Sequence, residues 1–271
     1  MYKDVHELRA DLLERLGLGQ HLILYGPRGS GKSRLVDQLH ARFVGTGTPC
    51  AIARSTSCLE DVTRALQVAY PQVNTQAANK RTARYRLWSA ADRRRCVLLL
   101  DHVTDVGTAM ISFFRRLRGG VAGVLFVIDV DVERERLRMR KRGRSLALSV
   151  RMPLASTRQL RRLLRSRCAE HGFSVEPESE HQLLQNAHGR PGWIVLCTRL
   201  MADARYWHEG HLFSTLLCTD TEITLRQGDL HLLAPENWTP ESGRAWESPL
   251  TNYDEEGFWK NTRPSAPRKP Y

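Results

Sequence analysis

The amino-acid sequence predicts an α/β fold, in which a parallel sheet flanked by helices is followed by a small helical lid, a C-terminal hairpin and an extended tail. Three observations lead to this prediction. A glycine-rich segment at residues 26–33 lies between an apolar run and an amphipathic run. A second apolar run, residues 96–100, ends in an acidic residue. From residue 21 to residue 129, apolar runs alternate with helical patterns, which is typical of a parallel sheet covered on both faces.

The glycine-rich segment carries the pattern G-x-x-x-x-G-K-[ST], which is typical of a phosphate-binding loop. Its residues are Gly26, Pro27, Arg28, Gly29, Ser30, Gly31, Lys32 and Ser33. Glycines let backbone N–H groups face a phosphate chain, and the helix that follows directs its positive end at the same anion. In such a loop Lys32 contacts the β- and γ-phosphates of ATP, and Ser33 binds Mg²⁺. The alternative is a chance glycine-rich turn.

The flanks of the loop fit the strand–loop–helix context that the motif requires. Residues 21–25 form a short apolar run that predicts a buried strand. Residues 34–40 have apolar positions spaced for a helix packed on a sheet. Before the strand, apolar residues between positions 5 and 16 form another helical stripe.

The remaining elements follow from the same patterns. Further strands are expected at residues 50–53, 96–100, 121–129 and 146–152, and further helices at residues 57–68, 81–92 and 109–117. The lid is expected to contain helices at residues 157–171, 178–187 and 191–206. Alternating apolar residues at 219–233 predict the hairpin. We therefore expect a core at residues 1–150, a lid at 151–218, and a hairpin with a proline- and aromatic-rich tail at 219–271.

Asp101 ends the apolar run at residues 96–100. An acid in this position is typical of a Walker B strand, whose aspartate holds Mg²⁺ through water. The alternative is an ordinary buried strand followed by an acidic turn. Because ligands bind at the carboxyl ends of parallel strands, we expect Gly31, Asp101 and Asp129 at one edge of the sheet.

The charge distribution favours a polyanionic partner, since the chain has a net charge of +12. From Arg134 to Arg167 the only acidic residue is Glu135, and a second basic cluster lies between residues 80 and 95. These segments suit contact with the DNA backbone without base readout, because no helix-turn-helix or zinc-finger pattern is present. The alternative is a basic face that only meets solvent.

Other classes of protein fit the sequence poorly. No apolar run approaches the roughly 20 residues that span a bilayer, and the N-terminus lacks the apolar core of a signal peptide. We therefore expect a cytoplasmic protein without membrane contact. The six cysteines include no C-x-x-C pair, which argues against a zinc or redox site and favours buried thiols in a reducing compartment.

The order of phosphate loop, Walker B strand, further strand and lid with Gly189-Arg190-Pro191-Gly192 resembles the AAA+ ATPases. Within them, residues 12–205 are most similar to the origin-recognition and archaeal-ATPase branch, which includes ATPases that select targets for transposons. The resemblance implies binding of ATP and Mg²⁺, self-association into a ring or filament, and engagement of DNA. It also implies transposition or other regulatory proteins as partners, with mobile-element targeting as the setting.

The resemblance implies roles for several further residues. Arg142 and Arg144, just before the lid, match an arginine finger that acts on the nucleotide of a neighbouring subunit. The alternative is that they are ordinary surface charges. Arg190 lies near the place of the second sensor arginine, and the alternative is a turn that only starts a lid helix. Asp129 or Asp131 falls in the region of the first sensor, where the family usually has Asn or Thr.

One position departs from the family pattern. The residue after the Walker B aspartate is usually Glu, which orients the attacking water, and here it is His102. A neutral imidazole is able to accept a proton. We therefore expect weak hydrolysis and a nucleotide-gated regulator, with Asp101 and His102 as the candidate catalytic groups. A signalling switch of the STAND type that acts on protein partners is the alternative function, and a small-molecule kinase is disfavoured.

Overall fold

A computed structural model of the chain describes residues 2, 4–54, 59–73, 80–93, 96–103, 123–129 and 147–227. The chain divides into two compact units, Met1–Leu233 and Ala234–Tyr271, and all of the described residues belong to the first. The division into core, lid and tail at residues 150 and 218 stays a prediction.

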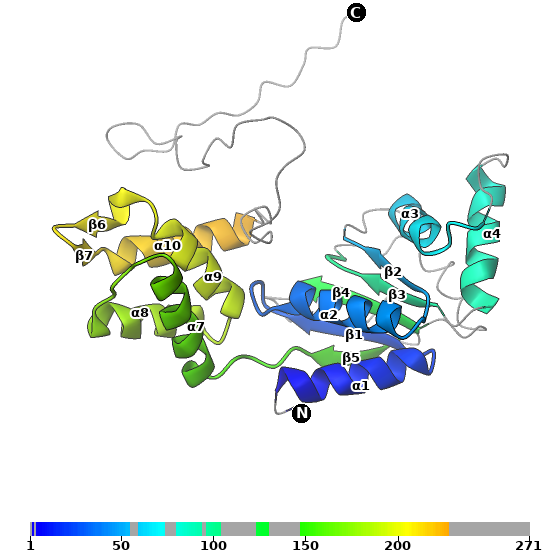
Figure 1. Cartoon of the computed structure of the whole chain (residues 1–271), viewed down its shortest axis with the longest axis horizontal. Coiled ribbons are helices and arrows are strands. Elements are labelled where there is room, and N and C mark those ends of the chain that lie inside the picture. Colours follow the sequence, from blue (N-terminus) through cyan, green and yellow to red (C-terminus); the bar gives the residue numbers. More distant parts are fainter. Residues whose placement is uncertain are drawn as a thin grey trace, which may run out of the picture. The chain divides into compact units, whose positions relative to one another are not determined.

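The predicted parallel sheet is confirmed. Its strands are β1 (His21–Gly26), β2 (Cys50–Ala53), β3 (Val97–Leu100), β4 (Gly123–Asp129) and β5 (Leu148–Arg151). They lie in the order β2-β3-β4-β1-β5, and each neighbouring pair is parallel (Figure 1). The carboxyl ends of β1, β3 and β4 therefore meet at one edge of the sheet, as the sequence predicted for Gly31, Asp101 and Asp129.

Helices cover both faces of this sheet. Two of them, α1 (Val5–Gly17) and α2 (Lys32–Gly45), bury their apolar stripes in one cluster with Leu22 and Leu24 of β1. The other two, α3 (Leu59–Ala69) and α4 (Lys80–Arg93), pack in a second cluster with Ile23. Successive residues of a strand point to opposite faces, so each strand contributes to both clusters. The strand β1, which leads into the glycine-rich loop, is therefore buried on both faces.

The lid is helical, as predicted. It consists of α7 (Thr157–Glu170), α8 (Pro177–Ala187), α9 (Pro191–Leu200) and α10 (Ser214–Gln227). A short 3₁₀ turn (Ala204–Tyr206) and a two-stranded antiparallel ladder of β6 (Trp207–His208) and β7 (His211–Leu212) connect α9 to α10. Figure 1 shows these elements in green to orange.

The predicted hairpin at residues 219–233 is wrong over the residues that the structure describes, because α10 runs through them to Gln227. Threonines and a branched aliphatic residue favour a strand locally. The buried residues instead recur every three to four positions, as on one side of a helix, at positions 217, 218, 220, 221, 224 and 225. Packing of this stripe on the other lid helices therefore overrides local propensity. The helix predicted at residues 109–117 lies outside the described residues.

Two predicted exclusions concern the described residues. Cys50, Cys96, Cys168, Cys197 and Cys218 are all buried and free, as expected for structural thiols. Within the described ranges, no helix combines the length and apolar character needed to cross a membrane.

Candidate functional site

The loop between β1 and α2 has a backbone that only glycine adopts readily. Gly29 has a φ of 76° and Gly31 a φ of 93°. Gly31 is the N-cap of α2 and offers no side-chain oxygen to the first N–H groups of the helix. Those N–H groups and the helix dipole together form a site suited to an anion. The glycines of the motif therefore shape the loop as the sequence predicted.

Lys32 is buried inside this loop, with only 4% of its surface exposed. Its Nζ donates hydrogen bonds to the carbonyl oxygens of Gly26 and Pro27, both at 2.8 Å. The same Nζ lies 2.7 Å from Oδ1 of Asp129. The ammonium is thus held at the centre of the loop by two carbonyls and one carboxylate.

Asp129 ends β4, directly beside Gly26 in the sheet register. Besides Lys32, its carboxylate faces Nδ1 of His102 at 3.3 Å and Nε of Arg28 at 3.5 Å. Burial alone would raise the pKa of Asp129. The hydrogen bond from His102 and the charge of Lys32 outweigh burial and lower this pKa well below its usual range. Asp129 is therefore a carboxylate that faces three nitrogen donors.

The end of β3 brings Asp101 and His102 to the same place. Asp101 is 1% exposed, and its Oδ1 accepts a hydrogen bond from the backbone N–H of His102 at 3.1 Å. His102 has a φ of 51°, in the left-handed region that costs a non-glycine residue about 1 kcal/mol. Such strain is common at functional sites. It directs the imidazole toward Asp129, and the resulting hydrogen bond raises the pKa of His102.

The two predicted magnesium ligands lie near the same imidazole nitrogen. Nε2 of His102 is 3.4 Å from Oγ of Ser33 and 3.7 Å from Oδ2 of Asp101. Mg²⁺ typically takes one or two protein oxygens and completes its shell with water and phosphate. One hydroxyl and one carboxylate fit that preference. Among the described residues no group of three His, Cys, Asp or Glu side chains is placed to hold a metal ion.

The lid touches the phosphate loop through its own glycine. The N–H of Gly192, in the first turn of α9, donates to the carbonyl oxygen of Gly29 at 2.7 Å. A Cβ on Gly192 would lie 2.9 Å from Cα of Gly29. Arg28 reaches the lid from the loop side, since its Nη1 donates to the carbonyl oxygen of Arg226 at 2.5 Å. Two lid helices are therefore bonded to the loop itself.

Arg190, the candidate second sensor, is the N-cap of α9 and is 7% exposed. Its guanidinium forms an ion pair with Glu222 of α10, in which Nη2 is 2.7 Å from Oε2. Its Nε donates a hydrogen bond to the carbonyl oxygen of Ala187 at 3.0 Å. A cavity of about 400 Å³ adjoins this pair. Its lining includes Pro27, Leu154, Arg190, Trp193 and Glu222. That volume lies in the range of small-molecule sites.

The structure brings together the loop residues, Asp101 and His102, and places Arg190 beside the adjoining cavity. Arg142 and Arg144 lie outside the described residues, so their role stays a prediction. Sequence reasoning missed Arg54, whose Nη1 lies 3.7 Å from Oδ2 of Asp101. Arg54 directly follows β2, so the rule that ligands meet at the carboxyl ends of strands would have found it. It also missed Glu222, because that residue was assigned to a hairpin.

Comparisons with known proteins show a similar sequence family and similar folds. A family model described as an AAA domain matches residues 14–130. The structure of the Aeropyrum pernix ORC2 protein in ADPNP and ADP complexes is similar with a TM-score of 0.51 and 15% identity, over 81% of this chain and 66% of that chain. The Aeropyrum pernix ORC1 protein in complex with DNA is similar with a TM-score of 0.50 and 18% identity, over 80% and 66%. The chain thus spans slightly less than two thirds of either protein. No curated protein matches the sequence.

Proposed function

We propose that the chain is an ATP-binding regulator with weak hydrolysis, because residues 14–130 match the AAA domain model and the fold is similar to that of the ORC2 protein. The observation that carries the proposal is the buried Lys32 ammonium inside a glycine-shaped loop at the N-terminus of α2. A triphosphate chain is the ligand that this combination of N–H groups, helix dipole and cation recognises.

Phosphate binding requires Lys32 to exchange one partner. Its Nζ is 2.7 Å from Oδ1 of Asp129. This carboxylate oxygen occupies the place beside the ammonium that a phosphate oxygen would take. In the nucleotide-bound protein a phosphate oxygen takes over this cation, and Asp129 keeps His102 and Arg28 as partners. Nucleotide binding therefore rearranges the charges at the ends of β1, β3 and β4.

Ser33 and Asp101 would hold the magnesium ion that accompanies the nucleotide. When bound, Mg²⁺ would neutralise negative charge on the phosphates. His102 stands where the family has a water-orienting Glu, and its Nδ1 is already hydrogen bonded to Asp129. An imidazole held in this way is a weaker water-orienting group than a free carboxylate. We therefore expect slow turnover and a state that lasts while ATP is bound.

The lid connects the nucleotide to assembly. It is bonded to the loop through Gly192 and Arg28, so a change at the loop is transmitted to α9 and α10. We propose that ATP favours self-association into a ring or filament, in which Arg142 and Arg144 of one subunit act on the nucleotide of the next. In this assembly Arg190 would exchange Glu222 for the nucleotide.

DNA is the proposed macromolecular partner. The net charge of +12 favours a polyanion, and the similar ORC1 protein was solved in complex with DNA. The contact is expected with the backbone rather than with base edges. Targeting of a mobile element, together with transposition or other regulatory proteins in the cytoplasm, is the setting that we propose for this activity.

The proposal is tested by measuring duplex DNA binding at several salt concentrations, with and without ATP and Mg²⁺. We expect ATP to tighten binding and salt to weaken it. Lys32→Ala should remove the ATP effect and leave the salt effect. Absence of DNA binding under every condition, or affinity that is independent of salt, would contradict DNA engagement.

The alternative is a STAND-like switch that acts on protein partners. The specific observation in its favour is His102 in place of Glu, with its Nδ1 hydrogen bonded to Asp129, which suits holding nucleotide more than hydrolysing it. For such a switch, ATP would change self-association or protein binding while leaving DNA affinity unchanged.

A further inference from the structure

The outer face of α7 carries four arginines in a single stripe. Arg158, Arg161, Arg162 and Arg165 occupy positions i, i+3, i+4 and i+7, which share one side of a helix. We call them the α7 arginine face. All four are exposed, while Leu160, Leu164 and Cys168 of the same helix are buried. Packing of the apolar stripe therefore leaves the arginines directed at solvent.

The N-terminus of α7, the helix that carries this face, is capped by side chains. Ser156 and Gln159 form a capping box, in which the Ser156 Oγ accepts from the N–H of Gln159 at 3.3 Å and the Gln159 side chain accepts from the N–H of Ser156 at 2.8 Å. Such caps typically stabilise a helix by about 1 kcal/mol. The arginines therefore project from a helix whose first turn is stabilised by its cap.

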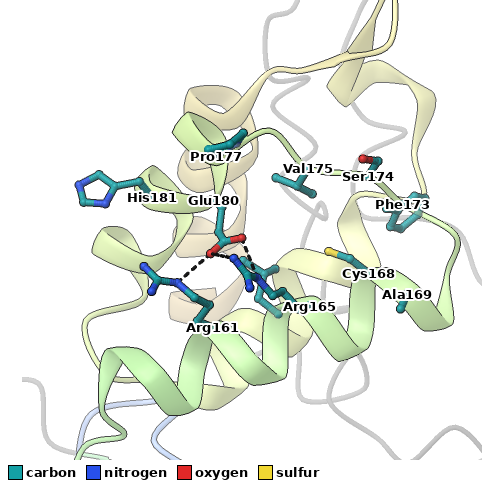
Figure 2. Close-up of a pocket in the computed structure, with 11 residues that line it drawn as sticks. Arg161, Arg165, Cys168, Ala169, Phe173, Ser174, Val175, Pro177, Glu180 and His181 are labelled. Atoms are coloured by element: carbon teal, nitrogen blue, oxygen red, sulfur yellow. Dashed lines mark hydrogen bonds and ion pairs between the residues drawn. The ribbon is translucent and has the colours of Figure 1, made fainter.

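Two of the arginines are held in place by one carboxylate from α8. Figure 2 shows Arg161 and Arg165 converging on Glu180. Nε of Arg161 is 2.8 Å from Oε1, and Arg165 makes a two-pronged contact with Nε at 3.1 Å and Nη2 at 3.2 Å. The Arg161 and Arg165 side chains remain 46% and 68% exposed. Each guanidinium therefore keeps further N–H donors for an external anion.

The other two arginines have no such partner. Within the described ranges Arg158 and Arg162 make no ion pair, although both lie on the same stripe. Glu180 offsets only one of the four positive charges. A strip of surface with excess positive charge favours a polyanion as its partner.

We propose that the α7 arginine face binds the phosphate backbone of duplex DNA. The inference rests on the proposed function, of which it names the contact surface. The stripe is about 10 Å long from Arg158 to Arg165. Duplex DNA carries one charge per about 1.7 Å of its axis, so the stripe meets several phosphates at once. Arginine forks pair with phosphate oxygens in a bidentate manner and read no sequence.

The test compares two double variants that remove the same charge. Arg158→Gln/Arg162→Gln removes the two members of the face that make no ion pair with the described residues and leaves Glu180 with its partners. Arg42→Gln/Arg64→Gln removes two exposed arginines from α2 and α3, which also make no ion pair within the described ranges. Gln is a good helix former, so both variants are expected to fold and to bind ATP as the wild-type chain does.

Binding of a labelled duplex of mixed sequence is measured by fluorescence anisotropy across a salt series. For the α7 variant we expect the slope of log K against log salt to fall by roughly 2, at about 0.9 per lost phosphate contact. The α2/α3 variant should keep the wild-type slope. In addition, Glu180→Gln should tighten binding and steepen the slope, because it removes the one opposing charge. A purely structural role for the arginines would not produce such a gain.

Each other outcome has a definite meaning. If the wild-type chain binds DNA and both double variants lose the same slope, the inference is wrong and the proposed function stands. If the wild-type chain binds no DNA while retaining ATP, both the inference and the proposed DNA engagement are overturned. If the α7 variant loses binding to polyglutamate or loses self-association, with DNA affinity unchanged, the face binds an acidic protein surface instead.

Discussion

The Lys32 ammonium and the Asp129 carboxylate form an ion pair inside the phosphate loop, with Nζ 2.7 Å from Oδ1. The pair joins the end of β4 to the start of α2, the helix that follows β1, and β1 is the strand beside β4 in the sheet. It also connects Lys32 through Asp129 to His102, which contacts Ser33. Any ligand that takes Lys32 away from Asp129 therefore alters the whole cluster.

Replacing Asp129 with Asn should destabilise the nucleotide-free protein and enlarge the effect of ATP. Lys32 is 4% exposed and would lose its only carboxylate partner among the described residues, at a cost of about 2 kcal/mol in the free energy of unfolding. Phosphates of ATP would restore a counter-charge, so the rise in Tm on adding ATP and Mg²⁺ should exceed that of the wild type. Thermal unfolding with and without nucleotide measures both effects.

A control for that change is Glu60→Gln. Glu60 pairs with Arg84 at the surface, where the two side chains are 55% and 28% exposed. Exposed pairs contribute roughly 0–1 kcal/mol. An ATP-induced shift that is the same in Asp129→Asn as in the wild type would show that Lys32 does not exchange Asp129 for phosphate.

Gly192→Ala should separate the lid from the loop. The added Cβ would lie 2.9 Å from Cα and 3.0 Å from the carbonyl oxygen of Gly29, both of which are backbone atoms that cannot rotate away. Overpacking of this kind costs about 1–3 kcal/mol. Gly45→Ala is the control, because nothing lies within 4 Å of its added Cβ and Ala favours the helix. In denaturant unfolding, the free energy of unfolding should fall for Gly192→Ala and rise for Gly45→Ala, each relative to the wild type. Equal stability of the two variants would argue against the close approach of Gly192 to Gly29.

The Arg190–Glu222 pair should stabilise the lid in a pH-dependent manner. Burial alone would raise the pKa of Glu222, but the hydrogen bond from Arg190 and the charges of Arg190 and Arg226 lower it overall. A folded-state pKa below the unfolded value of about 4.3 means that the contribution is complete above that value. The contribution is lost as the pH falls through the folded-state pKa.

The measurement is the free energy of unfolding against pH for the wild type and Glu222→Gln. Their difference should be constant above about pH 5 and should shrink in more acidic solution. A difference that grows as the pH falls would contradict the sign of the shift.

Asp101→Asn should separate nucleotide binding from hydrolysis. The Asn side chain keeps the size of Asp101, so the loop and Lys32 remain able to bind phosphate. Loss of the carboxylate weakens the hold on Mg²⁺, and turnover should fall by at least about tenfold. ATP affinity and hydrolysis are measured on the same preparation. Equal loss of both would mean that Asp101 supports the loop and not the metal.

Much of the fold follows from local patterns. The apolar runs at β1, β3 and β4 are continuous because both faces of a parallel sheet are buried, and such runs are easy to read. The loop motif fixes its own geometry, since Gly29 and Gly31 adopt φ values that other residues avoid. Asp101 was predicted correctly at the loop edge because the carboxyl ends of parallel strands meet there.

The contacts between distant segments were not predictable. The ion pair of Lys32 with Asp129 depends on which strand lies beside β1. The order of strands in a sheet cannot be predicted from a local sequence pattern. The Gly192–Gly29 contact depends on how α9 packs. The error at α10 has the same origin, because Ile223 and Leu225 fit a strand locally, whereas the buried residues of the helix, Leu225 among them, follow a helical spacing. Tertiary packing decided each of these cases.

The most direct test of the account is equilibrium binding of ATP with Mg²⁺ to the wild-type chain and to Lys32→Ala, with folding of both checked by circular dichroism. We predict saturable binding by the wild type and an affinity at least about tenfold lower for Lys32→Ala, which corresponds to about 1.4 kcal/mol or more. Equal affinities of the two proteins, or a wild-type chain that retains neither adenine nor guanine nucleotides, would contradict the claim that this loop binds a triphosphate.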